Sequence, residues 1–211
     1  MNWSELRESG MASNSNVQDP YLVSPDGVLR NLVGATSYAE LAKAEADLVS
    51  ARTVQLVDRN VVAHSRDDVE LRALHQHPFQ DMYDWAGQYR TIDMKKDLNG
   101  EFFAPAPHIR LLVNSLMLRL QEGGSFKDLS KSEFVTELVQ FYDELNYIHP
   151  FREGNGRTQR VFWSRVSFDA GWILDWRPIH GDELNEASRT ARENSETGQL
   201  QRALLKCIRP R

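Results

Sequence analysis

The segment HPFREGNGRTQR, residues 149–160, restricts the fold of this chain more than any other. It follows an apolar stripe at helical spacing that begins behind the capping-box sequence SKSE: Phe134, Leu138, Phe141, Leu145 and Ile148. A proline and two glycines prevent that helix from continuing, because proline lacks an N–H group and glycine favours turns. The sequence therefore predicts a core helix, a loop over 149–155 and a second helix from about Gly156 to Asp169.

The other segments predict a mainly α-helical fold with one β-hairpin. A second capping-box sequence, SYAE at 37–40, begins one helix. Further helices are expected over 68–85, from Pro107 to the glycine pair 123–124, over 182–194 and over 198–207. Pro78 should kink or divide the helix over 68–85. Residues 89–104 are rich in strand-forming side chains around the turn dipeptide Asn99-Gly100, so they predict the hairpin.

The composition indicates one soluble domain behind a polar tail. The chain has 211 residues, enough for a sizeable core, and residues 1–16 are predicted to form a disordered tail. The single cysteine, Cys207, excludes internal disulfides and suits a reducing compartment, so a cytoplasmic location is expected. The net charge of −5 supplies no general attraction for DNA, and no apolar run approaches the ~20 residues of a membrane span. Neither direct DNA binding nor membrane insertion is expected.

Two histidines outside the loop, His75 and His77, raise the question of a metal site. They are two residues apart on a predicted helix, so their side chains point to different faces. We therefore expect them to pack or to lie at the surface rather than to bind a metal together.

The loop and the start of the following helix have the composition of an anion site. A helix N-terminus presents unpaired N–H groups and a partial positive charge. Gly154 and Gly156 let the backbone approach a phosphate closely, and Asn155 between them tolerates unusual backbone angles and can donate a hydrogen bond. Arg157 and Arg160 lie three apart in the first helical turn, so both can grip phosphate oxygens.

Two further side chains of the loop suggest chemistry at that site. Glu153 would repel phosphate by itself, but one carboxylate together with phosphate oxygens is a usual environment for Mg²⁺. His149 is suited to removing a proton from an incoming hydroxyl near neutral pH. The set predicts phosphoryl or nucleotidyl transfer, whereas a capping histidine followed by an ordinary glycine turn is the structural alternative.

Taken together, the twelve positions resemble the signature of the Fic family, His-x-Phe-x-(Asp/Glu)-Gly-Asn-Gly-Arg-x-x-Arg, and match it at every fixed position. The flanking sequences DMYDWAGQYRTIDM, residues 81–94, and ELNYIHP are also similar to family members, so the resemblance covers about residues 17–207 as a single Fic domain. It implies the Fic fold, a compact helical domain in which the hairpin 89–104 is a flap that aligns a target segment by strand-like pairing.

The resemblance also implies a role for each matched position. His149 would be the general base, Phe151 the buried anchor of the loop and Glu153 the Mg²⁺ ligand. The nucleotide-binding set would comprise an anion hole and a phosphate clamp: Gly154, Asn155, Gly156, Arg157 and Arg160. The implied reaction is AMP transfer from ATP to a protein hydroxyl. Family members that transfer phosphate instead carry a lysine at the place of Gly156.

Partners and regulation are implied by the same resemblance. The small size and the DPY start resemble the bacterial toxin branch, which implies a target among the B subunits of DNA gyrase or topoisomerase IV. A separate small antitoxin with an inhibitory helix is the expected restraint. The alternative is internal, because SELRES at 4–9 nearly fits the inhibitory pattern and would place Glu8 against Arg160.

Two other classes of function remain open. A catalytically restrained nucleotide-binding regulator or protein-interaction module would keep the anion site and lose the base, and the presence of His149 speaks against it. A DNA- or topoisomerase-associated binding module would need a basic face, which the acidic balance of the chain disfavours.

Overall fold

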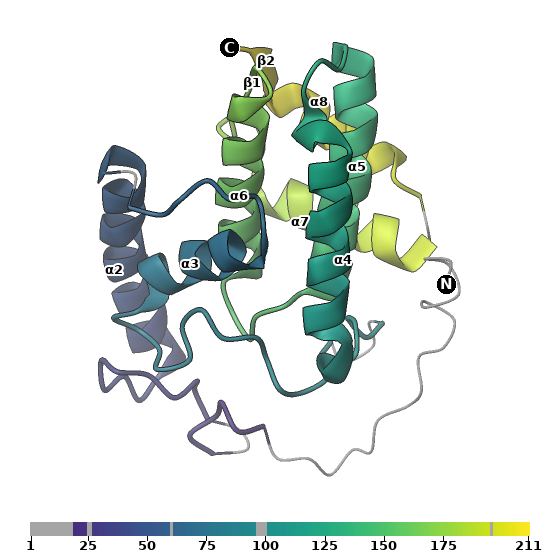
Figure 1. The fold of residues 1–211 in the computed structure, drawn as a ribbon. Coiled ribbons are helices and arrows are strands. Elements are labelled where there is room, and N and C mark those ends of the chain that lie inside the picture. The colour runs from purple at the N-terminus through teal and green to yellow at the C-terminus, as the bar shows by residue number, and fades with distance from the viewer. Residues whose placement is uncertain (1–18, 25–26, 60, 96–100, 195) are drawn as a thin grey trace.

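The computed structural model describes residues 19–24, 27–59, 61–95, 101–194 and 196–211. Seven α-helices account for most of these residues (Figure 1): α2 (Tyr38–Arg59), α3 (Asp68–Phe79), α4 (Ile109–Glu122), α5 (Lys131–Ile148), α6 (Asn155–Asp169), α7 (Gly181–Asn194) and α8 (Gly198–Cys207). Short 3-10 helices span Ala106–His108 and Gly124–Phe126. The prediction of a mainly α-helical fold is confirmed, whereas the predicted tail 1–16 lies outside the described residues.

Both predicted capping boxes begin their helices. At the start of α5, the Ser130 Oγ accepts a hydrogen bond from the Glu133 N–H, and a Glu133 carboxylate oxygen accepts from the Ser130 N–H at 2.9 Å. At the start of α2, Ser37 and Glu40 make the same exchange, at 3.3 and 3.2 Å. Each exchange satisfies two N–H groups that the helix itself leaves unpaired.

The predicted helix over 68–85 is shorter than expected. Helix α3 ends at Phe79, one residue after Pro78, and turns continue the chain toward Gly87, which has a φ of 78°. The prediction that Pro78 interrupts the helix is confirmed, and the extension to Trp85 is wrong. Proline cannot donate to the preceding turn, and Trp85 instead packs in a second apolar cluster beneath α2.

The segment 89–104 carries little regular strand. In its described part, Lys95 and Phe102 form one antiparallel bridge, while residues 96–100 with the predicted turn lie outside the described residues. A small antiparallel sheet of β1 (Trp172–Leu174) and β2 (Ile208–Pro210) was not predicted. Strands of three residues are too short to show an alternating pattern in the sequence.

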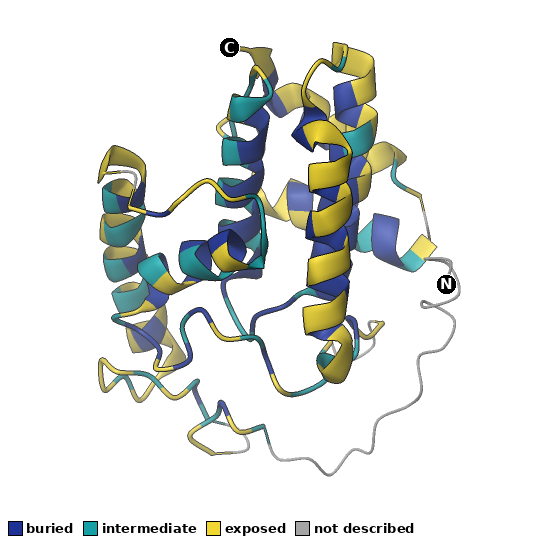
Figure 2. Ribbon diagram, viewed as in Figure 1, coloured by how far each residue is buried: buried dark blue, intermediate teal, exposed yellow. Residues whose placement is uncertain are grey.

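Helix α6 lies between the α2–α3 pair and the α4–α5 pair (Figure 1). The faces that the helices turn toward one another are buried, while their outer faces are exposed (Figure 2). The main core cluster includes Leu138, Phe151 and Trp163, and the second cluster includes Phe79 and Trp85. No described helix is both long enough and apolar enough to cross a membrane. The loop 149–154 runs along the boundary between the two clusters, so packing from both sides decides its shape.

Candidate active site

The loop between α5 and α6 begins and ends with left-handed backbone. His149 is the C-terminal cap of α5, with φ 46° and ψ 60°, and Gly154 precedes α6 with a φ of 80°. A Cβ atom at Gly154 would lie 2.4 Å from the Phe79 ring, so only glycine fits there. A Cβ at Gly156 would meet only an Arg160 nitrogen, at 3.5 Å. The backbone at Gly154 is therefore tightly packed against Phe79, whereas the space beside Gly156 is open.

The Asn155 side chain closes the loop on itself. Its Oδ1 accepts from the Phe151 N–H at 2.9 Å, and its Nδ2 donates to the Phe151 carbonyl at 2.7 Å. Phe151 is fully buried, as expected for the anchor of the loop. The side-chain amide of Asn155 thus supports the loop, and its own N–H in the first turn of α6 is the group that remains for an anion. Its predicted part in nucleotide binding rests on that N–H.

His75 fixes the loop from outside it. The imidazole is fully buried and stacks on Phe151, with centroids 3.9 Å apart, and on Phe79, at 4.7 Å. Its Nδ1 accepts from the Gly87 N–H at 2.8 Å, so its Nε2 donates to the Glu153 carbonyl at 2.9 Å. The expectation of a packing role is confirmed for this residue. Among the described residues, no group of three or more His, Cys, Asp or Glu side chains could hold a metal.

The His149 ring is held by one stacking contact and one backbone contact. Its ring stacks on Phe103 of the flap segment, with centroids 3.7 Å apart and planes 8° apart. Its Nδ1 lies 3.3 Å from the Asn146 carbonyl, and a carbonyl accepts only from a protonated nitrogen. In the neutral ring this contact leaves the proton-accepting lone pair on Nε2.

Arg90 joins the flap segment to the backbone of His149. Its buried guanidinium donates to four carbonyl groups: those of His149 (2.8 Å), Ile148 (3.2 Å), Ile92 (2.6 Å) and Ala104 (2.5 Å). Burial lowers the pKa of this guanidinium to about 10, so it stays charged at neutral pH. The carbonyls of Ile92 and Ala104, near the two ends of the flap segment, are thus both bound by one guanidinium.

The Glu153 side chain is 43% exposed. Its Oε1 accepts from the Gly154 N–H at 2.8 Å and lies 3.2 Å from Arg157 Nη2. A single exposed carboxylate fits Mg²⁺ only where phosphate oxygens and water supply the other ligands. The donor set therefore suits an ion that arrives with a nucleotide.

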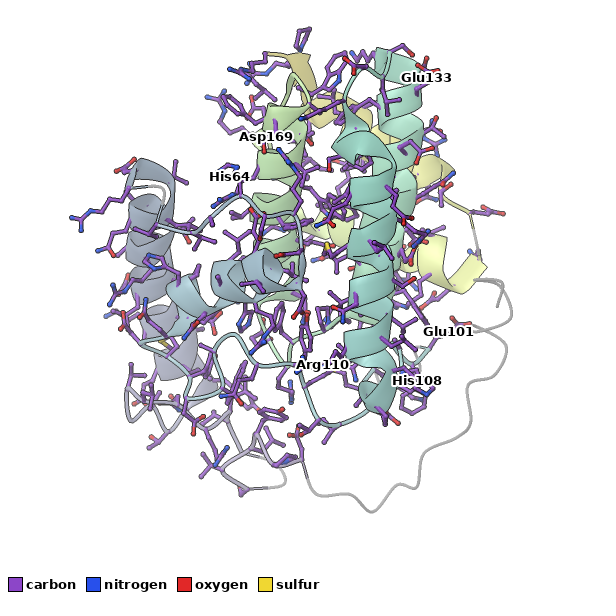
Figure 3. The ribbon with its side chains drawn as sticks, in the orientation of Figure 1. His64, Glu101, His108, Arg110, Glu133 and Asp169 are labelled. Carbon is purple, nitrogen blue, oxygen red and sulfur yellow. The ribbon has the colours of Figure 1, made fainter. Side chains whose placement is uncertain are left out.

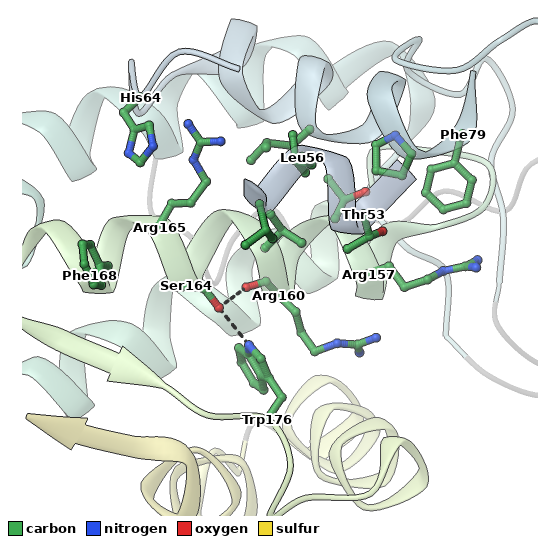
Figure 4. A pocket seen from close by; sticks show the side chains of 15 residues that line it. Thr53, Leu56, His64, Phe79, Arg157, Arg160, Ser164, Arg165, Phe168 and Trp176 are labelled. Atoms are coloured by element: carbon green, nitrogen blue, oxygen red, sulfur yellow. Dashed lines mark hydrogen bonds between the residues drawn. The ribbon is translucent and has the colours of Figure 1, made fainter. Parts of the chain in front are cut away.

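Two cavities flank the start of α6, and Arg160 lines both of them. The larger, of about 630 Å³, lies along the side of α6 that faces α2 and α3 (Figure 4). Its walls are mostly apolar, with four basic side chains: His64, Arg157, Arg160 and Arg165. At its far end, His64 and Asp169 approach to 3.3 Å (Figure 3).

The smaller cavity, of about 50 Å³, lies next to His149. It is lined by Phe103, His149 and Gly156, and by Asn185 and Ser188 of α7. The structure thus brings His149, Gly156 and Arg160 together around this cavity, while Arg157 lines the larger one.

Comparisons with known proteins identify relatives of this chain. A model of the Fic/DOC family matches residues 67–166. The probable protein adenylyltransferase Fic of Escherichia coli strain K12 is 32% identical over 173 residues, which cover 82% of this chain and 84% of that protein. The chain belongs to the Fic/DOC family. The probable protein adenylyltransferase y4lH of Sinorhizobium fredii is 36% identical over 166 residues, with 78% and 83% covered.

Solved structures of Fic domains share the fold. A Fic domain from Bartonella quintana, solved with bound ADP, has a TM-score of 0.84 at 24% identity and covers 90% of this chain and 95% of its own. The BepC protein of Bartonella tribocorum, solved with AMPPNP, has a TM-score of 0.84 at 23% identity, with 90% and 97% covered. The predicted Fic fold is confirmed. The relatives named as protein adenylyltransferases also confirm the predicted enzyme class, a nucleotidyltransferase.

We expect the free energy of unfolding to fall as the pH is lowered, in part because of His75. Burial lowers the pKa of this imidazole to about 4, from an ordinary value of 6.5. Between these values the unfolded chain binds a proton that the folded chain does not, so stability falls as the pH drops. The slope is at most about 1.4 kcal/mol per pH unit.

We expect His75→Asn to flatten the dependence of the unfolding free energy on pH between 6.5 and 4.5, as measured by urea unfolding. The exposed His180 offers a control, and His180→Asn should keep the parent slope. Equal slopes in the parent and His75→Asn would contradict the assignment of a buried neutral imidazole.

Proposed function

We propose that this chain transfers AMP from ATP to a hydroxyl side chain of a target protein. One observation carries the proposal: the proton-accepting Nε2 of His149 and the N-terminal turn of α6 are joined by a single short loop and share a cavity with Arg160. A base beside an anion site is the arrangement that attack by a hydroxyl on phosphorus requires.

The proposed reaction is an in-line displacement at the α-phosphorus. His149 Nε2 takes the proton from the target hydroxyl, and the hydroxyl oxygen forms a bond to the α-phosphorus. The bond from that phosphorus to the oxygen that bridges to the β-phosphate breaks, and pyrophosphate leaves. The N–H groups of Asn155 and Gly156 would stabilise the charge that develops on the α-phosphate oxygens, with Arg157 and Arg160 on the leaving phosphates.

The nucleoside would extend from the smaller cavity toward α7. Asn185 and Ser188 line this side and supply polar groups that suit a ribose or a base edge. The similar Fic domains that were solved with ADP and AMPPNP support a nucleotide ligand.

Mg²⁺ is part of the proposal. Glu153 would hold it, and the ion would neutralise charge on the phosphates. The exposed carboxylate beside the Gly154 N–H is the side chain of the loop best suited to a hard cation.

The target, the inhibitor and the location are proposed on the family resemblance. The target would be a B subunit of DNA gyrase or topoisomerase IV, and the chain would act in the cytoplasm as the toxin of a toxin–antitoxin pair. The larger cavity supports a helical antitoxin, because its wall is mostly apolar and carries Arg160, which suits an amphipathic helix with a carboxylate.

His149→Ala should abolish label transfer from α-labelled ATP to a protein in a bacterial lysate, while ATP binding persists. The imidazole acts on the attacking hydroxyl, so its loss lowers the rate without removing contacts to the nucleotide. In the parent, γ-labelled ATP should leave the target unlabelled. Transfer of the γ label, or equal labelling by parent and variant, would contradict the proposal.

Transfer should also require a divalent cation. We expect activity to disappear in excess chelator and to return with Mg²⁺ or Mn²⁺, and Glu153→Ala should raise the Mg²⁺ concentration needed for half-maximal rate, because the exposed carboxylate is its proposed ligand. Full activity in chelator would refute the role given to Glu153.

The isolated chain should be active without further treatment if the restraint is a separate protein. Glu8 lies outside the described residues, and Glu8→Gly should then leave the transfer rate unchanged. A rise of tenfold or more in Glu8→Gly would instead show internal inhibition, since a charge-assisted pair with Arg160 is worth about 1.5–3 kcal/mol.

A further inference from the structure

The first motif arginine is held by a residue outside the motif. Arg157 Nη2 lies 2.5 Å from Glu45 Oε1 on α2, more than a hundred residues earlier in the chain, and 3.2 Å from Glu153 Oε1. The guanidinium carbon also lies 4.7 Å from the centre of the Phe79 ring, and Figure 4 shows the two side chains next to each other. Arg157 therefore has one carboxylate from α2, one from its own loop and an aromatic face from α3.

Glu45 is itself fixed in place. The Tyr83 hydroxyl donates to Glu45 Oε2 at 2.5 Å, so the two carboxylate oxygens serve different partners, Tyr83 and Arg157. Burial, together with the neighbouring Glu45, raises the pKa of the Tyr83 hydroxyl far above its ordinary value, so this group remains a donor. The Glu45 side chain is only 15% exposed, so water competes little for the pair with Arg157.

This arrangement has two consequences for a phosphate ligand. An arginine that is already held in one conformation loses less side-chain entropy when it binds. In addition, Glu45 draws the guanidinium toward α2. Without Glu45, the carboxylate of Glu153 would be the remaining acidic partner of Arg157 among the contacts described. Arg157 would then compete with Mg²⁺, because the Glu153 oxygens are also the proposed ligands of the ion.

We propose that Glu45 is a positioning residue that holds Arg157 ready for the terminal phosphates of the nucleotide and so favours a triphosphate over a monophosphate. The inference rests on the proposed function, because it assigns Arg157 to the phosphates beyond the α-phosphate. Glu45 touches no reacting atom and acts through Arg157.

The test compares ATP with AMP as ligands of Glu45→Gln, by calorimetry at one fixed Mg²⁺ concentration. The substitution keeps the shape and removes the charge that holds Arg157. We expect ATP affinity to fall about tenfold, which is the cost of ordering one long side chain, and AMP affinity to change less than twofold. Asp47→Asn is the matched control, because it removes the same charge from an exposed position on the same helix, and both affinities should stay at parent values.

Four outcomes would overturn the inference. Equal weakening of ATP and AMP would make Glu45 a purely structural residue. Tighter ATP binding in Glu45→Gln would make it a competitor of the phosphates. If the parent fails to bind ATP, this inference and the proposed function are both overturned. If the parent binds ATP but Glu45→Gln has the same ratio of ATP affinity to AMP affinity as the parent, only the inference is overturned.

Thermal melting of each variant identifies any loss of folding. Tyr83→Phe keeps the ring and removes only the hydroxyl that orients Glu45. It should therefore lower the ratio of ATP affinity to AMP affinity by a smaller factor than Glu45→Gln. If Glu45→Gln is unfolded, an unchanged ratio in Tyr83→Phe would overturn the inference.

Discussion

The shape of the site depends on one stack of buried rings. His75 lies between Phe151 of the loop and Phe79 of α3, and these two phenylalanines belong to different core clusters. The stack joins the clusters, and the two nitrogens of His75 tie the Gly87 N–H and the Glu153 carbonyl to it. Because Phe79 also lies against Gly154, the backbone that precedes α6 has little freedom. The backbone of the proposed anion site is thus held by core packing.

Arg90 holds His149 and the flap segment in a fixed arrangement. Its four carbonyl contacts span both ends of the flap segment and the last turn of α5, so Phe103 and His149 are stacked within one hydrogen-bonded unit. A buried guanidinium can join backbone groups in this way because each of its three nitrogens donates to a carbonyl, without a second charged side chain. Positioning of a hydroxyl relative to His149 would therefore depend on residues that lie far from the motif in sequence.

Much of this fold was readable from local sequence signals. The capping box at Ser130 set the start of α5, and Pro150 with Gly154 set the loop, because these signals act over a few residues. The same reasoning missed the roles of Arg90 and Glu45, and for His75 it predicted packing but not the hydrogen bonds to Gly87 and Glu153. Each role depends on contact between segments that are 59 to 112 residues apart in the chain, and no local pattern records such a contact. The Asn155 side chain was assigned to the ligand for the same reason, since its bond to Phe151 becomes visible only when the loop is folded.

The central claim is that the loop 149–156 is an anion site already in place. A crystal structure of the protein with Mg²⁺ and a non-hydrolysable ATP analogue tests it most directly. The account predicts phosphates on the N-terminal N–H groups of α6, the α-phosphorus on the side of His149 Nε2, and a loop backbone that superimposes on the one described here. A nucleotide bound only in the cavity between α2 and α6, a γ-phosphate next to His149, or a loop that refolds around the ligand would contradict it.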